Sequence, residues 1–510
     1  MRAVTTEQMR AADAAAVERS GDTALMRAAG SVIAAAIARV APRARTLVAF
    51  AGSGNNGGDA YAAFACIAPA ARRIVYALPC PHPSTGRSDA EERARRSGVV
   101  TRPFPATAEA ARTALAGADL ALDALLGTGG HSEPAAGLHA VIDALAANDG
   151  RVLAIDIPSG VDAATGAVAT HCVRACATVT LGAPKLGLLL EPARACTGTL
   201  YVGDIGIGDE IAGVAGDVYA VLDRAEFSAL LPARGKESDK RLSGAPLIIA
   251  GSAQFPGAAV LCARGAARAG AGYVTVATAE NAAASLRAHL VEEVVVAYDE
   301  RDVAAAIEAL LDLTQRSTSV AIGPGLGLSD ATGAIVRGFL AKLERPFVAD
   351  ASALFHLAKH LDILRGKACV LTPHGGEFAR LSGEGTIAPR TRIARLRSFV
   401  SRTGVTTLLK GNTTLVDDGK TTHLNVTGTS ALATAGTGDV LTGMIATLLA
   451  QGLAPADAAR AAAYWHGLAG QEAASERPVG VVAGDVHEAL GRALAAPDPT
   501  PPSDCLARIA

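Results

Sequence analysis

Short runs of consecutive apolar residues, separated by helical segments, recur through most of the chain. An apolar run that does not alternate with polar residues is typical of a strand buried on both faces, as in a parallel sheet covered by helices. The sequence therefore predicts an α/β fold built on parallel sheets. In the first part of the chain the predicted strands are 46–50, 74–78, 120–126, 152–157, 177–181 and 200–205. In the second part they are 246–250, 273–277, 319–322, 347–349, 368–371 and 406–409, followed by a hairpin around 417–420 and helices from 437 to about 495.

The chain of 510 residues is longer than one hydrophobic core usually supports, about 250–300 residues, so two domains are predicted. The alternation of strands and helices stops in a polar stretch near residues 221–241. We expect a doubly wound, Rossmann-like domain at 1–220, a linker at 221–240 and a second α/β domain at 241–495. The proline-rich remainder, 496–510, is predicted to be a flexible tail.

Composition excludes several classes of function. The net charge is −2, from 47 Lys plus Arg against 49 Asp plus Glu, which gives no electrostatic footprint for nucleic acid. The eight cysteines are scattered and predict no disulfide framework. Charged residues interrupt the N-terminal segment. The charge-free segments 243–263 and 440–456 are broken by glycine and polar residues, so neither offers the roughly 20 apolar residues that a membrane span needs, and no membrane helix is predicted. We expect a cytoplasmic homo-oligomer that acts on small molecules.

One glycine-rich turn, Gly436-Thr437-Gly438-Asp439, stands directly before an apolar helix. Free backbone N–H groups at a helix N-terminus attract phosphate. Asp439 lies where its carboxylate could take a proton from a hydroxyl that attacks this phosphate. The turn predicts phosphoryl chemistry, with a plain helix-terminal carboxylate as the structural alternative for Asp439.

A second glycine cluster spans residues 52–59, between a predicted strand and a helix. Gly52, Gly54 and Gly57 satisfy the G-x-G-x-x-G pattern of dinucleotide-binding folds. The acidic residue expected about 20 positions later is absent, which disfavours a plain dehydrogenase. The two glycine clusters are too far apart to share one nucleotide, so two separate sites are predicted.

Three further strand ends near the second cluster carry polar residues. Because the carboxyl ends of adjacent parallel strands converge on one crevice, these side chains are expected to meet there. Each alone has a structural alternative, since Asp156 could cap a turn and Asp123 could be a hydrogen-bonded core carboxylate. The side chains predicted to meet are Asn56, Asp123, Asp156, Ser159 and Lys185.

Residues 1 to about 215 resemble the NAD(P)H-hydrate epimerase family, through the segments 54–59, 156–160 and 183–185. The resemblance implies that Asp156 acts as the acid and base of an epimerase, with Lys185 as its electrostatic neighbour. It also implies a potassium ion held by Asn56, Asp123 and Ser159. The residues that it places around the hydrated dinucleotide are Asn55, Asn56, Gly57, Gly58, Asp59, Gly127, Thr128, Gly129, Gly130, His131, Ser132, Glu133 and Asp156.

Residues from about 240 to 495 resemble the ADP- or ATP-dependent NAD(P)H-hydrate dehydratase family, which has a ribokinase-like fold. The matching segments are 251–259, 323–327, 372–377, 410–414 and 436–439. The resemblance implies that Ala258, Gly325, His374 and Asp439 contact the hydrate, with Asp439 catalytic. The residues implied to hold ADP or ATP with Mg²⁺ are Lys410, Gly411, Asn412, Thr413, Thr414 and Gly438. His374 could instead cap the helix that begins at Gly375, and Glu377 is expected to order its first turn.

The leading hypothesis is a bifunctional repair enzyme for hydrated NADH and NADPH. The first domain would interconvert the R and S hydrates, and the second would dehydrate the S hydrate through a phosphorylated intermediate. Two alternatives stay open at this point. The second half could be a true small-molecule kinase fused to a dinucleotide-binding module, and the first half could bind a dinucleotide without turnover.

Overall fold

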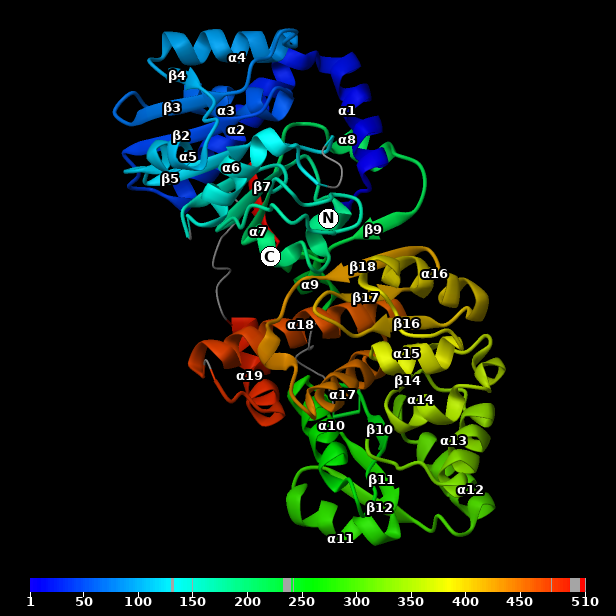
Figure 1. Cartoon of the computed structure of the whole chain (residues 1–510). Helices are drawn as coiled ribbons and strands as arrows, with labels where there is room; N and C mark the ends of the chain where they lie inside the picture. The colour runs from blue at the N-terminus through cyan, green and yellow to red at the C-terminus, as the bar shows by residue number, and fades with distance from the viewer. Residues whose placement is uncertain are drawn as a thin grey trace. The chain divides into compact units, whose positions relative to one another are not determined.

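The computed structural model describes residues 1–129, 133–148, 150–232, 240–241, 243–477, 479–495 and 505–509. The chain divides into two compact units, Met1–Tyr219 with the C-terminal segment, and Ala220–Asp498 (Figure 1). Gly130, His131 and Ser132, which the sequence places around a dinucleotide, lie outside the described residues. Each unit is described by itself below.

The first unit contains a sheet with the strand order β19-β8-β7-β6-β5-β2-β3-β4. Strands β2 to β8 pair in parallel, and β19 pairs with β8 in antiparallel register. The strands are β2 (Thr46–Ala51), β3 (Arg72–Ala77), β4 (Val100–Pro103), β5 (Leu120–Ala124), β6 (Val152–Ile155), β7 (Ala177–Leu181), β8 (Thr199–Gly203) and β19 (Leu506–Arg508).

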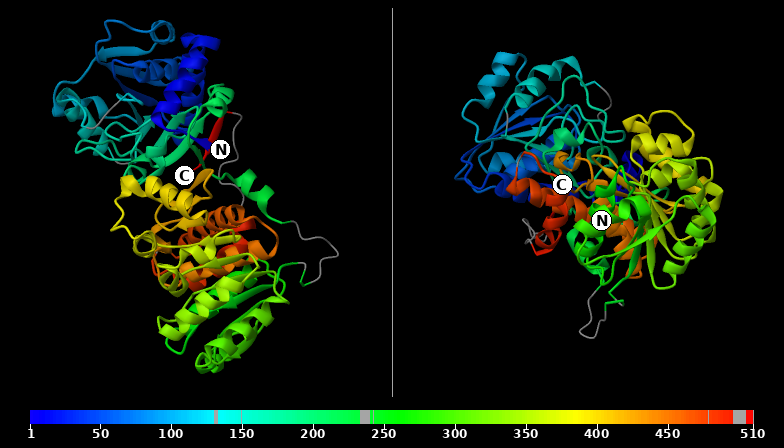
Figure 2. Two further views of the ribbon diagram at one scale, coloured as in Figure 1. Left: turned by 90° about the vertical axis from the view of Figure 1, so that its right-hand side faces the viewer. Right: turned by 90° about the horizontal axis from the view of Figure 1, so that it is seen from below.

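Helices cover both faces of this sheet (Figures 1 and 2). Along β2, Leu47 and Ala49 belong to one apolar core with α1 to α4, and Val48 and Phe50 belong to another with α5 and α6. This alternation is the period of two of a strand buried on both sides. The helices are α1 (Thr6–Ser20), α2 (Asp22–Val40), α3 (Asn55–Cys66), α4 (Thr85–Arg96), α5 (Ala108–Leu115), α6 (Ala136–Ala146), α7 (Arg194–Thr197) and α8 (Gly208–Gly213).

The α2 helix is long and apolar enough to cross a membrane by length and composition, with a mean hydropathy of 1.4. No membrane helix was predicted for this segment from the sequence. One face of α2, including Met26, Ile33 and Ile37, is buried in the core of the first unit. A buried core helix passes the same test, so we interpret α2 as part of this core.

Strand β2 lies between β3 and β5, and the order of the strands reverses at this point. The chain moves from β2 through β3 to β4 on one side, and from β5 to β8 on the other. Ligands of open α/β sheets bind at such a switch point, outside the carboxyl ends of the strands. The loops that follow β2 and β5, beginning at Gly52 and Leu125, lie there.

The second unit contains a sheet with the order β18-β17-β16-β15-β14-β13-β10-β11-β12. All neighbours pair in parallel except the β16–β17 and β17–β18 pairs, which are antiparallel. The strands are β10 (Pro246–Ile249), β11 (Thr275–Ala279), β12 (Val294–Tyr298), β13 (Ser319–Ile322), β14 (Phe347–Ala349), β15 (Cys369–Leu371), β16 (Thr406–Leu409), β17 (Thr414–Asp417) and β18 (Thr421–Asn425).

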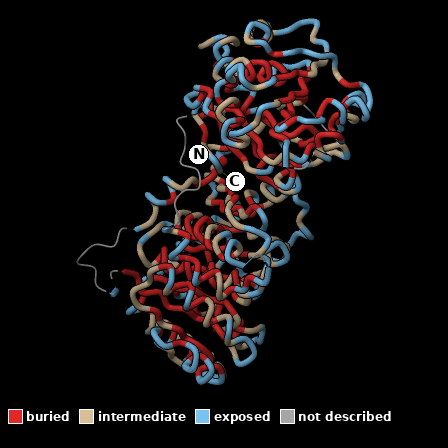
Figure 3. Tube along the Cα trace, turned by 90° about the vertical axis from the view of Figure 1, so that its left-hand side faces the viewer, coloured by how far each residue is buried: buried red, intermediate tan, exposed pale blue. Residues whose placement is uncertain are grey.

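One face of this second sheet carries a large core. Ile248, Ala321 and Val348 belong to it, together with residues of α10 and α17 to α19. Helices α12 to α14 pack side by side (Figure 1), and buried residues are concentrated in the interior of the chain (Figure 3). The helices are α9 (Arg224–Leu230), α10 (Pro256–Arg268), α11 (Glu280–His289), α12 (Val303–Thr314), α13 (Asp330–Lys342), α14 (Ser352–Leu357), α15 (Gly375–Ser382), α16 (Arg392–Thr403), α17 (Thr437–Ala450), α18 (Pro455–Glu476) and α19 (Ala483–Ala495).

Strand order also reverses in the second unit, between β10 and β13. Backbone hydrogen bonds join the loops after these strands, from Gly251 N to Pro324 O (2.8 Å) and from Gly323 N to Ile249 O (3.1 Å). The glycine motifs at 251–259 and 323–327 therefore meet at the switch point.

Two sequence-based expectations are wrong. The segment 221–240 is not simply a linker, because α9 forms within it and Phe227 is fully buried in the core of the second unit. The segment 496–510 is not entirely a flexible tail, because Leu506–Arg508 forms β19 at the edge of the first sheet. In addition, β4 and β12 were not predicted. Every residue of β4 is exposed, so it has no apolar run, whereas Val294–Val296 in β12 did carry a β-branched signal.

Candidate active sites in the two units

Asp156 and Lys185 form a buried ion pair at the carboxyl ends of β6 and β7. Lys185 Nζ donates to Asp156 Oδ1 at 2.5 Å and to Leu181 O at 2.8 Å, and its side chain is 1% exposed. Thr180 Oγ1 accepts from Lys185 Nζ and donates to the same Asp156 oxygen. A buried ammonium with these partners fixes one carboxylate oxygen of Asp156 in place.

The backbone of Asp156 is in the left-handed region, with φ 64°. A non-glycine residue in this region is strained, and such strain is concentrated at functional sites. The second oxygen, Oδ2, faces the loop after β5, since a Cβ built on Gly127 would lie 3.8 Å from it and 3.4 Å from Asn56 Cβ. Asp156 Oδ2, Gly127 and Asn56 therefore border the same small space.

Asp123 and Ser159 are joined by two hydrogen bonds beneath this space. Ser159 donates from its backbone N to Asp123 Oδ2 and from Oγ to Oδ1, both at 2.7 Å. Asp123 is fully buried, and burial raises the pKa of its carboxyl to about 6 against the lowering effect of these bonds. The predicted meeting of Asn56, Asp123, Asp156, Ser159 and Lys185 at one edge of the sheet is observed.

Asn56 presents an oxygen with an unsatisfied hydrogen-bonding capacity. Its Nδ2 donates to Leu126 O at 2.8 Å, whereas its Oδ1 is buried and accepts no hydrogen bond from the described residues. A buried acceptor without a donor is costly unless another group, such as a cation, compensates it. The donor chemistry at this position therefore fits the cation that the sequence resemblance implies.

Two further carboxyl groups belong to the neighbourhood of Lys185. Asp59, on α3, has a pKa well above its usual value because of burial and then because of the charges of Asp156, Asp22 and Asp13. Asp13, on α1, also has a raised pKa, caused by burial and opposed by Lys185. Sequence reasoning missed Asp13, because nothing in the pattern of α1 distinguishes it from a surface residue of a helix.

Arg87 holds the glycine loop after β2 in shape. Its Nη1 donates to Gly52 O at 2.8 Å and to Gly54 O at 2.6 Å, and its side chain is almost fully buried. A Cβ on Gly57 would lie 2.2 Å from Gly52 O, so only glycine fits there. Arg87 was not predicted, because it stands 30 residues beyond the motif, on a helix that no sequence signal connects with the loop.

The other residues predicted around the first dinucleotide have mixed surroundings. Asn55 Oδ1 accepts from Ser84 Oγ at 3.0 Å, and Thr128 O accepts from Arg10 Nη2 at 3.2 Å. Glu133 is already engaged, because its carboxylate accepts from Thr170 N and His171 N. Gly58 packs closely against Met26 and Arg87, since a Cβ there would lie 3.0 Å from Met26 Cε and 3.2 Å from Arg87 Cβ.

In the second unit, Asp439 lies in the first turn of α17, after the left-handed Gly436. Burial, with the charges of Asp350 and Glu377, raises the pKa of the Asp439 carboxyl to about 7, and Lys410 opposes this shift. A carboxyl group with a pKa near neutrality can both accept and release a proton at physiological pH.

Asp350 was not among the predicted site residues. It is 2% exposed, its Oδ1 accepts from Lys410 Nζ at 2.8 Å and its Oδ2 from Thr442 Oγ1 at 2.8 Å. Glu377 lies 3.9 Å from the same ammonium. Asp350 stands at the end of strand β14, as Asp156 does after β6, so the rule applied to the first domain could have found it.

The loop from Lys410 to Thr414 is held from behind by Arg392, another residue that sequence reasoning missed. The Arg392 guanidinium donates to the carbonyls of Lys410, Thr413 and Leu409. Gly411 is packed against this guanidinium, and Thr414 Oγ1 donates to Gly411 O at 3.1 Å. Gly438 faces the loop, since a Cβ there would lie 3.4 Å from Lys410 Nζ.

Ala258 and Gly325 are brought together at the second switch point. Gly325 has φ 66°, and a Cβ on it would lie 2.9 Å from Ala258 Cβ and 2.6 Å from Phe255 O. His374 caps α15 instead of standing free, because its Nδ1 accepts from Gly376 N, as the structural alternative expects. Glu377 Oε2 accepts from His374 N and orders the first turn.

Comparisons with known proteins match both units. Residues 246–492 match the family model described as NAD(P)H-hydrate dehydratase, and residues 22–187 match the one described as YjeF-related protein N-terminus. A bifunctional NAD(P)H-hydrate repair enzyme of Moorella thermoacetica is 36% identical over 463 residues, which cover 88% of this chain and 87% of that protein. The chain belongs to the bifunctional NAD(P)H-hydrate repair enzyme family.

Other members of the bifunctional NAD(P)H-hydrate repair enzyme family show the same extent of similarity. The protein of Mycobacterium tuberculosis H37Rv is 35% identical, with 89% of this chain and 90% of that protein covered. The crystal structure of an ADP/ATP-dependent NAD(P)H-hydrate dehydratase from Bacillus subtilis is 32% identical and covers 54% of this chain and 96% of that one, with a TM-score of 0.48. The expected fold class is confirmed, with an N-terminal doubly wound unit and a C-terminal unit of the ribokinase-like dehydratase type.

Proposed function

We propose that this chain repairs hydrated NADH and NADPH at two separate sites. The first unit interconverts the R and S hydrates, and the second dehydrates the S hydrate with ADP or ATP. One observation carries this proposal. Each unit brings a carboxyl group and a lysine together near the carboxyl ends of its strands: Asp156 is ion-paired with Lys185, and Asp439 lies within electrostatic range of Lys410. Family membership over most of the chain agrees with it.

In the first unit, epimerisation requires the C–O bond of the hydrated carbon to break and form again on the other face of the ring. Asp156 is the group that donates a proton to the leaving hydroxyl and takes it back from the returning one. Lys185, bonded to Oδ1, leaves Oδ2 for this transfer. The first residues of α3, 55–59, and the segment 127–133 bind the rest of the dinucleotide.

A potassium ion fits the first site through Asn56, Asp123 and Ser159. The support is the buried Asn56 Oδ1, which has no donor among the described residues, beside the buried carboxylate of Asp123. When bound, the ion would supply positive charge to Asn56 Oδ1, which has no donor among the described residues, and to the Asp123 carboxylate, which so far has only hydrogen bonds. A hydrogen bond to Leu126 O fixes the side chain of Asn56, and a hydrogen bond to Asp123 fixes that of Ser159.

In the second unit, Asp439 removes the proton from the hydroxyl of the hydrate as this oxygen attacks the terminal phosphate. The N–H groups at the start of α17 and the Lys410 ammonium hold the negative phosphates. The attack breaks the bond between this phosphate and the rest of the nucleotide, which leaves as the shorter nucleotide. The phosphate ester then leaves from the ring as free phosphate while the neighbouring ring carbon loses a proton, and the C=C bond of the dihydronicotinamide forms again. Phosphate is a far better leaving group than hydroxide, which is why the hydroxyl is phosphorylated first. Mg²⁺, bound with the nucleotide, supplies charge neutralisation to the phosphates.

The test is a reaction of the purified chain with mixed hydrate epimers, Mg²⁺, K⁺ and either ADP or ATP, followed by the near-ultraviolet absorbance of the dihydronicotinamide. We expect complete recovery with release of free phosphate. Accumulation of a stable phosphate ester without restored absorbance would identify a small-molecule kinase instead.

Two wider expectations accompany this proposal. The enzyme acts in the cytoplasm, where reduced coenzymes and adenine nucleotides occur together. It assembles as a homo-oligomer, which the mass of the chain in solution tests directly.

A further inference from the structure

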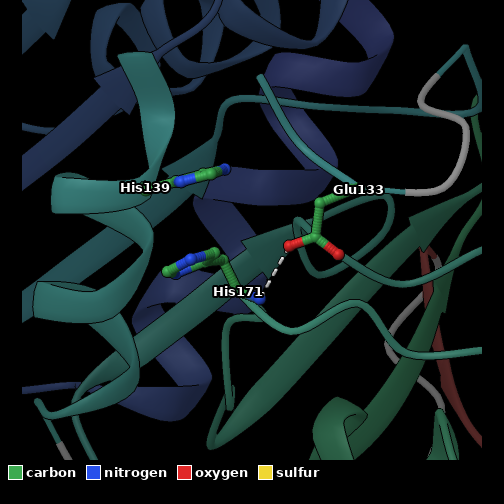
Figure 4. Close-up of side chains that lie close together, drawn as sticks. All are labelled: Glu133, His139 and His171. Carbon is green, nitrogen blue, oxygen red and sulfur yellow. Dashed lines mark hydrogen bonds between the residues drawn. The ribbon is translucent and has the colours of Figure 1, made fainter. Parts of the chain in front are cut away.

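Glu133, His139 and His171 bring three metal-binding side chains together in the first unit (Figure 4). One ligand atom from each lies within 4.8 Å of the other two. The three residues come from separate segments: Glu133 precedes α6, His139 lies on α6, and His171 lies in the loop between β6 and β7. None of the interactions assigned to Asp156 or Lys185 involves the two histidines.

The hydrogen bonds of the two imidazoles determine which nitrogen carries the proton. His139 Nε2 lies 2.8 Å from Pro134 O, and a carbonyl can only accept, so this nitrogen is the donor. His171 Nδ1 donates to Asp143 Oδ1 at 2.7 Å. Each neutral ring therefore keeps a lone pair on its other nitrogen. Histidines that bind metals characteristically donate their second N–H to a carboxylate or a backbone carbonyl in this way.

Glu133 supplies a carboxylate oxygen to the same place. Its carboxylate accepts hydrogen bonds from Thr170 N at 3.1 Å and from His171 N at 3.2 Å. These two backbone bonds also fix the carboxylate beside the His171 segment, as Figure 4 shows for the His171 bond.

We propose that Glu133, His139 and His171 form a binding site for a Zn²⁺ ion, with Asp143 orienting His171. Two imidazoles and one carboxylate are a donor set that zinc prefers, and water completes the tetrahedron. Calcium and magnesium are disfavoured because they take oxygen ligands. The rings are now stacked, with centroids 3.8 Å apart and planes 14° apart, so one imidazole must turn about its side-chain bonds to direct its lone pair at the ion.

A bound ion would connect two segments that border the first site, the loop after β5 and the turn after β6. The loop that ends at Glu133 begins next to Asp156 Oδ2, at Gly127. The His171 segment is hydrogen-bonded to the turn after β6, from Ala169 N to Gly160 O and from Val173 N to Ser159 O. Zinc would therefore hold the substrate loop against the turn that carries Ser159, without contact with the reacting atoms.

The experiment is calorimetric titration of the full chain, freed of metal, with Zn²⁺. The wild-type chain is expected to bind one ion more than the double variant His139→Ala/His171→Ala. Asp143→Asn should weaken this binding by about 10–100-fold, as loss of an orienting partner does. His289→Ala serves as the matched control and should leave binding unchanged, because the imidazole of this exposed histidine in the second unit bonds only Ser285 O among the described residues.

Titration with Co²⁺ distinguishes this site from a thiolate site at the nearby pair Cys172 and Cys196, which lie within hydrogen-bonding range of each other. The expected visible spectrum shows ligand-field bands without a thiolate charge-transfer band. Circular dichroism checks that each variant is folded. Equal Zn²⁺ affinity and stoichiometry in the folded double variant, or loss of binding in Cys172→Ser/Cys196→Ser, would overturn the proposal. Because the experiment measures metal binding and not turnover, a negative result would reject the zinc site without testing the proposed repair function.

Discussion

Lys410 Nζ lies 2.8 Å from Asp350 Oδ1 in the second unit, and the other oxygen of Asp350 accepts from Thr442. Burial opposes the charge of Lys410, but the charges of Asp350, Glu377 and Asp439 outweigh it and raise the pKa of this ammonium. Asp350 thus keeps Lys410 charged for an anion and, by the same negative charge, raises the pKa of Asp439. One buried carboxylate influences both the anion-binding group and the proposed base.

The pH dependence of dehydration follows from the pKa of Asp439, about 7 in the structure. A general base works only when deprotonated, so kcat/KM should rise with pH through about 7 and fall towards zero below it. Asp350→Asn removes a negative charge that raises this pKa, and the acidic limb should move to lower pH. A pH–rate profile of both chains is the measurement, and an unmoved limb in a folded Asp350→Asn chain would contradict this role.

Potassium should stabilise the first unit through Asn56. The uncompensated Oδ1 of Asn56 gains a partner when the ion binds, so KCl should raise the midpoint of thermal unfolding more than an equal concentration of choline chloride. Asn56→Ala should abolish this difference. Asn148→Ala, whose buried Nδ2 is a donor and cannot bind a cation, is the control. An undiminished effect of potassium in Asn56→Ala would exclude Asn56 as a ligand.

Replacement of Asp59 by Asn should stabilise the chain increasingly as pH rises. Burial raises the folded-state pKa of Asp59 well above its unfolded value, so folding must take up a proton at any pH between the two. Asparagine avoids this cost. The free energy of unfolding of Asp59→Asn minus that of wild type should therefore grow as the pH rises from the unfolded pKa of Asp59 towards its folded pKa.

Asp89→Asn is the opposite control for Asp59. The hydrogen bond from Arg27 lowers the pKa of Asp89. Asp89→Asn should therefore reduce the free energy of unfolding at pH values above the unfolded pKa of Asp89. The reduction should be small, because solvent screens this ion pair. Urea unfolding at several pH values measures both variants. Parallel pH curves for wild type and Asp59→Asn would show that Asp59 is not protonated in the folded state.

Truncation of Phe227 should destabilise the second unit, although this residue lies in the predicted linker. Its ring is fully buried, 4.9 Å from the ring of Tyr464 and 6.4 Å from that of Trp465. Phe→Ala in a core usually costs about 3–5 kcal/mol. Phe355→Ala, at a ring that is 39% exposed, should cost much less. Urea unfolding of the two variants tests whether α9 belongs to this core, and equal small losses would contradict it.

Much of the fold follows from local pattern. Buried strands such as Phe347–Ala349 and Ser319–Ile322 coincide with the predicted ranges, because strands covered on both faces are rich in apolar residues. Exposed edge strands such as β4 carry no such signal, and β19 depends on pairing with β8, far away in the sequence. Helix α9 is short and buries a single residue, Phe227, so its sequence shows no apolar periodicity from which a helix could be predicted.

The residues of the two sites also fall into two groups, those that the sequence pattern predicts and those that only the folded chain reveals. Residues at strand ends, such as Asp156 and Asp123, could be found because the geometry of parallel sheets brings them together. Asp350 obeys the same rule. Arg87 and Arg392 could not be predicted. Each supports a glycine-containing loop from a helix that is many residues away from this loop in the sequence. Each also bonds backbone carbonyl oxygens, which every sequence provides and which therefore leave no signal. The proton distribution over Asp59 and Asp439 depends on burial, which only the folded chain defines.

The most direct test of two independent sites is complementation with mixed hydrate epimers, Mg²⁺, K⁺ and nucleotide, on a timescale shorter than unaided epimer exchange. We predict that Asp156→Asn converts only the S hydrate to dihydronicotinamide, so that the absorbance stops rising before recovery is complete. Asp439→Asn should restore no absorbance. A mixture of the two folded variants should reach the complete recovery of wild type. Complete recovery by Asp156→Asn alone, or failure of the mixture to exceed it, would contradict the assignment of one reaction to each unit.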